Sequence, residues 1–412
     1  MHKLICLIVT WVLLFNQAYA AISNKSIHKN NQLNTYLTLN TVELEHYNQR
    51  IKDIDRNDFA ANLVFDYGSK TLSSAVEINI RGRGSVHCDR KSFSVNFPGD
   101  KTFPALPHSV SNKYLLISMC LDESYIRTTT VLNIWKKQGL LPLEFKMTEL
   151  FINDKTQGIY LLIEKPVDAL ARKFHDIQFI FRRHFNNTKE GYDLKYATID
   201  RDLAHGDLLH AFLNIEELDT KALAEKLAKT INLEQFITHL AIAAILKNGD
   251  YIDELFLIQK KSQAHRGYHY SFMSWDPEDT FDTCHYNGQY AYKDPWDIAY
   301  CVESKLGKLI LKNPLLYKKF IAKIEELINQ TLSIHNFSIH LNQTVQSLDS
   351  FMKRTNTANA MLQFKKQYKT DITHEIAMKK IIETANKITR IHQNQTNNIL
   401  KKITHYKNET QH

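Results

Sequence analysis

Short runs of alternating apolar and polar residues constrain the fold of this chain more than any other feature of its sequence. Such alternation is typical of strands that are buried on one face. The predicted strands cover residues 76–80, 93–97, 145–152, 158–164, 254–259 and 268–274. Residues 153–157 are the predicted turn of a hairpin, and residues 165–218 show no regular pattern.

Helical patterns lie between these strands and dominate the end of the chain. One helix is predicted from Ser124 to Gln138, where Gly139 ends it. A second is predicted from Leu233 to Lys247, with Asn232 as its N-cap. Beyond Ser304, Ile and Leu recur at helical spacing. The sequence therefore predicts an α+β fold with a helical C-terminal extension.

The N-terminus has the three parts of a secretory signal peptide. A basic start is followed by an apolar run from Leu4 to Phe15 and by Ala18-Tyr19-Ala20, an A-x-A cleavage pattern. A membrane anchor is the alternative, but the apolar run is shorter than the roughly 20 residues that a spanning helix needs. We predict cleavage after Ala20, no transmembrane anchor in the mature chain, and a secreted, periplasmic or cell-surface location.

These features divide the chain into four predicted parts. They are a signal peptide (1–20), a polar lead-in (21–60), a core (61–304) and a helical C-terminal part (305–412). The net charge of +8 resides in the tail, because residues 351–412 contain 12 Lys or Arg and 4 Asp or Glu. This basic tail either contacts an acidic partner or forms a solvated helix face. No nucleic-acid partner is expected.

Four cysteines remain after the signal peptide, namely Cys88, Cys120, Cys284 and Cys301. An even number in an oxidising compartment predicts two disulfides, with three pairings open. Proximity in sequence favours a bond between Cys284 and Cys301. No C-x-x-C spacing is present, so a structural zinc site is not expected.

Four charged residues provide the groups that phosphoryl transfer from ATP requires, in the order along the chain in which protein kinases carry them. Cationic groups bind the triphosphate, carboxylates hold magnesium, and a carboxylate orients the attacking hydroxyl. Lys91 opens a predicted strand, Glu164 ends another, Asp250 follows a helix, and Asp276 ends the next hairpin. That hairpin is expected to return Asp276 to the side on which Asp250 lies.

Four motifs in this order resemble those of the spore-coat protein H (CotH) kinase family. They read R-G-R-G-S at 81–85 with R-K-S-F at 90–93, L-D-E-S-Y-I-R at 121–127, N-D-K-T-Q-G-I-Y-L-L-I-E-K at 153–165, and N-G-D at 248–250 with S-W-D at 274–276. The resemblance extends from about residue 74 to 282. It implies an atypical protein-kinase-like fold and a secreted enzyme that uses ATP and Mg²⁺.

The resemblance also implies roles for individual residues. Asp250 corresponds to the catalytic aspartate. Asp276 corresponds to a magnesium ligand, and Glu278 and Asp279 are further candidate ligands. The implied activity is transfer of the γ-phosphate of ATP to Ser or Thr of a protein substrate.

The nucleotide would be held by residues that precede this pair. Lys91 and Glu164 correspond to the nucleotide lysine and its partner, and Arg81 and Arg83 are expected to contact phosphates. Taken individually, each has an ordinary structural alternative, such as a solvated strand lysine, a strand-end charge or a hairpin turn.

Two positions depart from the family pattern. Glu254 stands where the family commonly has Asn, and Glu278 stands in place of the second Asp of W-D-x-D. Two alternative functions follow. One is a catalytically inactive surface adhesion or binding protein on the same fold, and the other is an enzyme that transfers AMP instead of phosphate.

Overall fold

The structure is a computed structural model that describes residues 36–41, 51–66, 71–82, 85–99, 105–122, 124–186, 189–250, 255–261, 270–284, 289–353, 355–361 and 371–410. Within these ranges, no helix combines the length and apolarity needed to cross a membrane. The predicted signal peptide, residues 1–20, lies outside the described residues.

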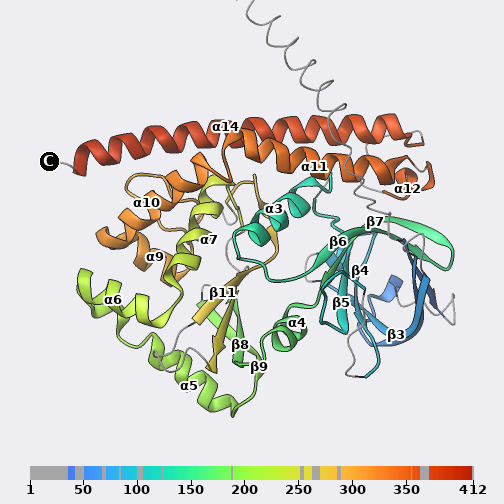
Figure 1. Ribbon diagram of the computed structural model, residues 1–412, viewed down its shortest axis with the longest axis horizontal. Coiled ribbons are helices and arrows are strands. Elements are labelled where there is room, and N and C mark those ends of the chain that lie inside the picture. The colour runs from blue at the N-terminus through green and yellow to red at the C-terminus, as the bar shows by residue number, and fades with distance from the viewer. Residues whose placement is uncertain are drawn as a thin grey trace, which may run out of the picture. The chain divides into compact units, whose positions relative to one another are not determined.

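Seven strands form a closed barrel in the first part of the chain (Figure 1). In barrel order they are β1 (Tyr36–Thr41), β2 (Phe59–Asp66), β3 (Thr71–Arg81), β4 (Ser92–Asn96), β5 (Lys113–Ile117), β7 (Lys155–Glu164) and β6 (Phe145–Ile152). Neighbours are antiparallel except β1 and β6, whose parallel pairing closes the barrel. Alternate residues of these strands, such as Leu63, Ile78, Val95 and Leu162, form a separate apolar core.

The barrel begins earlier than the predicted core. Strand β1 lies inside the stretch 21–60 that its polar composition marked as a lead-in, and β2 begins at Phe59. Six residues of β1 pair with β2, and four of them also pair with β6. A closing strand is held by hydrogen bonds on both of its edges, so a weak apolar pattern is sufficient there.

A second sheet of four strands has the order β11 (Tyr270–Ser274), β10 (Leu255–Lys260), β8 (Ile177–Asn186) and β9 (Lys189–Ala197). The sequence predicted β10 and β11, but it gave no pattern for β8 and β9. In β8 the charged pair Arg182-Arg183 interrupts the apolar alternation. The charge of buried Arg183 is compensated by Glu190 of β9, whose Oε1 lies 2.7 Å from the Arg183 Nε.

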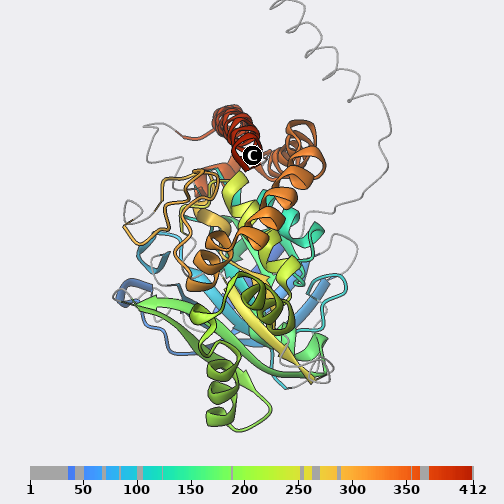
Figure 2. The ribbon, with the colours of Figure 1, turned by 90° about the vertical axis from the view of Figure 1, so that its left-hand side faces the viewer.

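Helices make up most of the remaining described chain. They are α3 (Ile126–Lys137), α4 (Pro166–Lys173), α5 (Arg201–Ala211), α6 (Thr220–Thr230), α7 (Leu233–Ile245), α9 (Lys305–Lys312), α10 (Pro314–Asn329), α11 (Ile334–Met352), α12 (Thr355–Ala360) and α14 (His374–Thr410), with 3₁₀ turns η1 (Ser85–His87), η2 (Ile215–Glu217) and η3 (Pro277–Asp279). The long helix α14 runs beside α11 in both views (Figures 1 and 2). Helix α11 also packs on α3, and α12 packs on β7. The predicted α+β fold with C-terminal helices is therefore confirmed.

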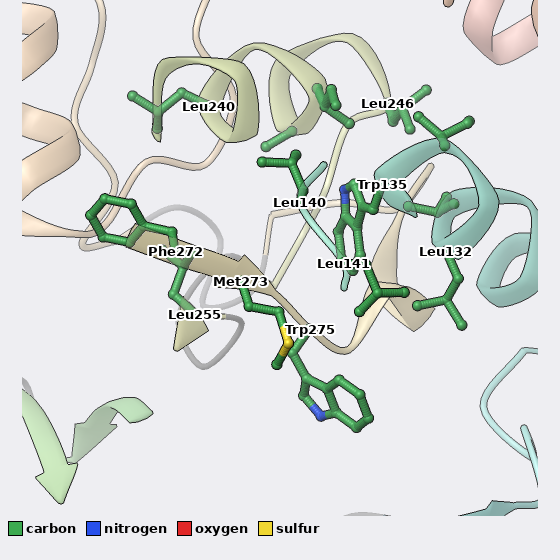
Figure 3. Close-up of a cluster of buried hydrophobic side chains, with 14 of the residues drawn as sticks. Leu132, Trp135, Leu140, Leu141, Leu240, Leu246, Leu255, Phe272, Met273 and Trp275 are labelled. Carbon is green, nitrogen blue, oxygen red and sulfur yellow. The ribbon is translucent and has the colours of Figure 1, made fainter. Parts of the chain in front are cut away.

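Helix α7 lies at the centre of the larger apolar core. All of its residues from Phe236 to Ile245 are buried, which explains why its sequence is apolar on every face. Its side chains meet Trp135 of α3 and the Leu140-Leu141 segment above strand β11 (Figure 3). As predicted, Asn232 caps the helix, with its side-chain oxygen accepting a hydrogen bond from the Gln235 N–H at 3.1 Å.

Candidate active site

The hairpin formed by β10 and β11 brings the two predicted catalytic segments to one end of the sheet. Leu255, five residues after Asp250, pairs with Ser274, two residues before Asp276. The expectation that the hairpin returns Asp276 toward Asp250 is therefore confirmed. Both carboxylate side chains are partly buried.

Backbone hydrogen bonds join the segment that carries Asp250 to the segment after Asp276. The Gly249 N–H donates to the Asp279 carbonyl at 2.9 Å, and the Phe281 N–H donates to the Leu246 carbonyl at 2.8 Å. The Asp282 N–H completes the set with a 3.3 Å bond to the Lys247 carbonyl. Asp250 is thus held on a loop whose position is set by the neighbouring acidic segment.

Gly249 follows the end of α7, but its backbone conformation is not what ends the helix. The left-handed backbone conformation at the end of α7 belongs to Lys247, with φ 50°. Gly249 is required because a β-carbon there would lie 2.1 Å from the Thr283 carbonyl oxygen. The glycine permits close approach of two backbones directly before Asp250.

Asp276 has an unusual backbone conformation and a firm support. Its φ of 58° and ψ of 67° are left-handed, a region that Asp tolerates better than most residues. On the strand before it, the Oγ of Ser274 lies 2.7 Å from Nδ1 of buried His239 on α7. The turn into η3 is therefore anchored to the core helix.

Arg81 brings a positive charge from the barrel to this turn. It is the last residue of β3, and the charges that act on its pKa are those of Asp276, Glu278 and Arg182 of β8. Burial lowers the pKa of the guanidinium, while the two carboxylates oppose that shift. The next residue, Gly82, has φ 113°, and a β-carbon there would lie 2.2 Å from the Ser85 Oγ. Glycine is therefore needed to turn the chain beside Arg81.

The carboxylates around η3 repel one another. Burial, together with the nearby charges of Asp276, Asp279 and Asp122, raises the pKa of Glu278 to about 8, against the opposing charge of Arg81. Asp122 is fully buried, and its Oδ1 accepts no hydrogen bond among the described residues. The excess negative charge of this group would be relieved by a bound cation.

The last two residues of the motif L-D-E-S-Y-I-R begin α3, and Arg127 of the motif meets this acidic segment. Asp122 Oδ2 accepts a hydrogen bond from the Thr128 N–H at 2.9 Å, and burial raises the pKa of this carboxyl. Arg127 lies between two carboxylates, with its Nε 3.6 Å from Asp122 Oδ1 and its Nη1 3.5 Å from Asp282 Oδ2. Arg127 thus connects α3 to the chain after η3.

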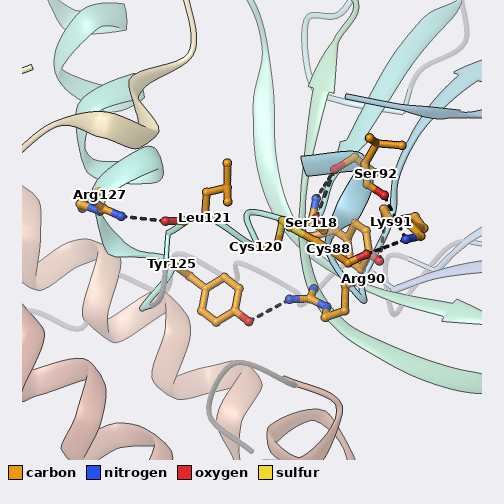
Figure 4. The surroundings of a disulfide bond; sticks show 11 residues. Cys88, Arg90, Lys91, Ser92, Ser118, Cys120, Leu121, Tyr125 and Arg127 are labelled. Atoms are coloured by element: carbon orange, nitrogen blue, oxygen red, sulfur yellow. Dashed lines mark hydrogen bonds between the residues drawn. A yellow bond between two sulfur atoms is a disulfide. The ribbon is translucent and has the colours of Figure 1, made fainter. Parts of the chain in front are cut away.

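A disulfide joins the residue before this motif to the segment that follows R-G-R-G-S (Figure 4). Cys88, just after η1, is bonded to Cys120, two residues before Asp122. Below the bond, buried Arg90 donates from Nη1 to the Tyr125 hydroxyl at 2.8 Å and from Nε to the Gln157 carbonyl at 2.8 Å. The arginine of R-K-S-F therefore ties the barrel to α3.

The second disulfide joins Cys284 and Cys301, as proximity in sequence suggested. Glu303 lies near these sulfurs, and the three donor atoms fall within 4.8 Å of one another. Because the two sulfurs are bonded to each other, they are not thiolate ligands for a metal. Two disulfides are the expected pattern for a protein that folds in an oxidising compartment.

The structure gives Lys91 and Glu164 separate partners instead of pairing them. Lys91 Nζ donates to the carbonyls of Val86 and Cys88, at 3.0 and 2.7 Å. Glu164 is buried, and its carboxylate accepts bonds from the Ser109 hydroxyl at 2.6 Å and the Glu144 N–H at 2.8 Å.

The register of the barrel explains this separation. The Lys91 carbonyl accepts a hydrogen bond from the Tyr160 hydroxyl, and Glu164 stands four residues further along β7. At about 3.3 Å per residue, that spacing is about 13 Å of strand.

The remaining predicted site residues fall into two groups. The structure brings some of them close to one another, and the others lie outside the described residues. Arg81, Asp276, Glu278 and Asp279 form one electrostatic cluster. Arg83 and Glu254 lie outside the described residues. Asp122 and Arg127 received no role from the sequence, although the motif containing them was visible, and Arg182 had no sequence signal at all.

A strand barrel, a core helix followed by an aspartate loop, and a hairpin ending in a second aspartate define a kinase-like α+β protein. The sequence model of the CotH kinase protein family matches residues 78–388, and the chain belongs to that family. No curated protein matches the chain.

Proposed function

We propose that the protein transfers the γ-phosphate of ATP to a Ser or Thr hydroxyl of a protein substrate. The observation that carries this proposal is the convergence of Arg81, Asp276 and Glu278, beside the Asp250 loop that is hydrogen-bonded to Asp279. Membership of the CotH kinase family supports nucleotide use. Phosphoryl transfer needs these groups because it depends mainly on positioning and charge neutralisation.

In this proposal each residue has a separate role. Asp250 accepts the proton of the acceptor hydroxyl and orients its oxygen toward the phosphorus. Arg81 supplies the positive charge for the phosphate oxygens, a role for which its place beside Asp276 suits it better than Lys91, whose ammonium already bonds two backbone carbonyls. Arg182 adds a second positive charge on β8 near Arg81.

The acidic residues suit a Mg²⁺ ion that is held partly by protein carboxylates and partly by the phosphates of a bound nucleotide. Among the described residues, Asp276, Glu278, Asp279 and Asp122 do not form a set of three whose oxygens all lie within 4.8 Å of one another. Magnesium in such sites is usually held by one or two carboxylates together with substrate phosphates. Asp276 and Glu278 would hold the ion, which neutralises phosphate charge when bound.

Incubation with γ-labelled ATP and magnesium tests the proposal directly. Asp250→Ala and Asp276→Ala are expected to abolish the labelling that the wild type shows. Asp371→Ala, at an exposed position remote in sequence from the site, is the matched control and should label normally. Equal labelling of all four proteins, or none in any, would overturn the proposal, and the mass added to the acceptor separates phosphate from AMP.

Thermal stability with and without nucleotide separates an enzyme from a pure adhesion protein. A protein that binds ATP and magnesium in its folded state is stabilised by them. We expect this stabilisation in the wild type and its loss in Asp276→Ala. We further propose that the protein acts outside the cytoplasm, which its two disulfides support.

A further inference from the structure

A pocket of about 590 Å³ lies on the helical side of the second sheet, between α5, η2, β9 and α9. This volume is within the range of about 300–1,000 Å³ typical of binding pockets. Its apolar lining comes from Leu208, Leu209, Phe212, Ile215, Leu306 and Leu309. None of the predicted catalytic or nucleotide residues lines it, so it is separate from the candidate active site.

Exposed leucines occur at this pocket and just after the helix that lines it. Leu209, which lines the pocket, is 70% exposed, and Leu213 just beyond the helix is 53% exposed. Four of the ten large hydrophobic residues exposed in the described chain fall within residues 203–218. We call the pocket together with Leu209 and Leu213 the α5 surface. A clustered apolar surface of this kind marks an interaction site.

The charge of this segment is opposite to that of the whole chain. Residues 199–219 contain six Asp or Glu and one Arg, whereas the chain carries a net charge of +8. Asp200 and Asp219 cap helices α5 and α6. Glu216 and Glu217 are exposed at the pocket, and their carboxylates make no hydrogen bond or ion pair within the part of the chain that the structure describes.

The inner wall of the pocket is fixed before any partner arrives. Glu190 of β9 accepts hydrogen bonds from Arg183 Nε at 2.7 Å, from the Tyr192 hydroxyl at 3.0 Å and from the Lys305 N–H at 2.6 Å. Its carboxylate is therefore fully engaged, and β9 is held to α9. A rigid wall lowers the entropic cost of binding.

We infer that the α5 surface binds a basic amphipathic helix of a partner protein. Apolar side chains of the helix would enter the pocket, and its Lys or Arg residues would face Glu216 and Glu217. That this partner is also the phosphate acceptor rests on the proposed function. A second copy of the chain also carries a basic helix, α14, but the apolar side chains of that helix are already buried against its own chain and are not free to enter the pocket.

The test measures binding of a fluorescent synthetic helix of Leu, Ala and Lys to the full chain carrying Asp250→Ala, without ATP. A matched peptide has every Lys replaced by Glu. We expect the basic peptide to bind, with an affinity that falls as salt is added, and the acidic peptide to bind about tenfold more weakly or not at all.

Variants of the α5 surface locate the binding site. Leu209→Asp, and Glu216→Lys combined with Glu217→Lys, should each weaken binding about tenfold. These positions are exposed, so the fold should persist, which circular dichroism checks. The controls Leu315→Asp on α10 and Glu383→Lys on α14 are also exposed and should bind normally.

Three results would overturn the inference. They are equal binding of the two peptides, unchanged binding by the α5 variants, and a wild-type dimer that Leu209→Asp converts to monomer in sedimentation. Because this assay uses no ATP and a catalytic variant, it succeeds or fails independently of the labelling experiment. If both proposals hold, fusing the basic helix to an acceptor should lower its KM and leave kcat unchanged.

Discussion

The backbones of Gly249 and Thr283 are in such close contact that a β-carbon on Gly249 would lie 2.1 Å from the Thr283 carbonyl oxygen. This contact joins the loop of the predicted catalytic aspartate to the chain that follows the acidic turn. It explains why glycine directly precedes Asp250, and it makes the position of that carboxylate sensitive to a single added methyl group.

Gly249→Ala is expected to displace the Asp250 loop. Overpacking of this kind costs about 1–3 kcal/mol of stability, and a misplacement of about 1 Å can reduce a reaction rate about 100-fold. Thermal unfolding and ATP labelling measure the two effects. The control is Gly206→Ala on α5, where a β-carbon would meet nothing within 4 Å and stability should rise by about 0.5–1 kcal/mol. Wild-type labelling by Gly249→Ala would contradict the prediction.

Arg127→Leu should strongly destabilise the protein because it leaves the fully buried Asp122 carboxylate without its cation. Breaking a buried pair in this way costs about 3–5 kcal/mol, measured by urea unfolding. Adding Asp122→Asn should restore part of the loss, since the remaining group is then neutral. Arg390→Leu, at an exposed site on α14, should change stability little. A double variant no more stable than Arg127→Leu would argue against this pairing.

Removing the Cys88–Cys120 bond by changing both residues to Ser should cost about 3–4 kcal/mol, because the bond closes a segment of 32 residues. The loss should appear as a lower melting temperature without reductant. The wild type in reductant should melt at a lower temperature still, since Cys284–Cys301 is then also broken. If the double variant melts like the oxidised wild type, this bond does not stabilise the fold.

Stability should fall with acidification because of His392, which is buried on α14 and stacked on Phe337 with ring centroids 4.1 Å apart. Burial lowers its pKa from 6.5 to about 4. The unfolded chain therefore binds a proton below about pH 6.5, whereas the folded chain does so only below about pH 4. Stability is complete above this window and falls through it by about 3 kcal/mol.

The check is unfolding at several pH values with His392→Phe, which should show a shallower loss between pH 6.5 and 4. His335→Phe, at an exposed site on α11, removes a histidine without this burial and should follow the wild-type curve. Equal slopes for the wild type and His392→Phe would exclude His392 as the cause.

Regular patterns made much of the fold predictable. The helix α7 and the hairpin of β6 and β7 formed close to where the sequence placed them, because their apolar spacing and the Asn232 cap are local signals. Strand β7 begins at Lys155, inside the predicted turn 153–157. Strands β8 and β9 were missed because buried Arg183 hides their pattern. Its charge is acceptable in a buried strand because Glu190, diagonally across on the neighbouring strand, pairs with it, and that contact exists only once β8 and β9 have paired.

The order of residues along the chain predicted part of the candidate site. It indicated that Asp250 and Asp276 approach one another, because an antiparallel hairpin between them returns the chain. It did not indicate that Lys91 and Glu164 stand apart, because that depends on the register of β4 with β5 and of β5 with β7. A shift of a few residues in a barrel moves a side chain by more than 10 Å along the strand.

By itself, the sequence determined the reactive groups, the local elements that carry them and the number of cysteines available for bonding. Only the tertiary structure decided which groups meet. It bonded Cys88 to Cys120, placed Arg81 beside Asp276 and Glu278, and turned Arg127 toward Asp122 and Asp282. The physical reason is that these contacts depend on barrel closure and loop pairing between distant segments, whereas periodicity and capping act only within one segment.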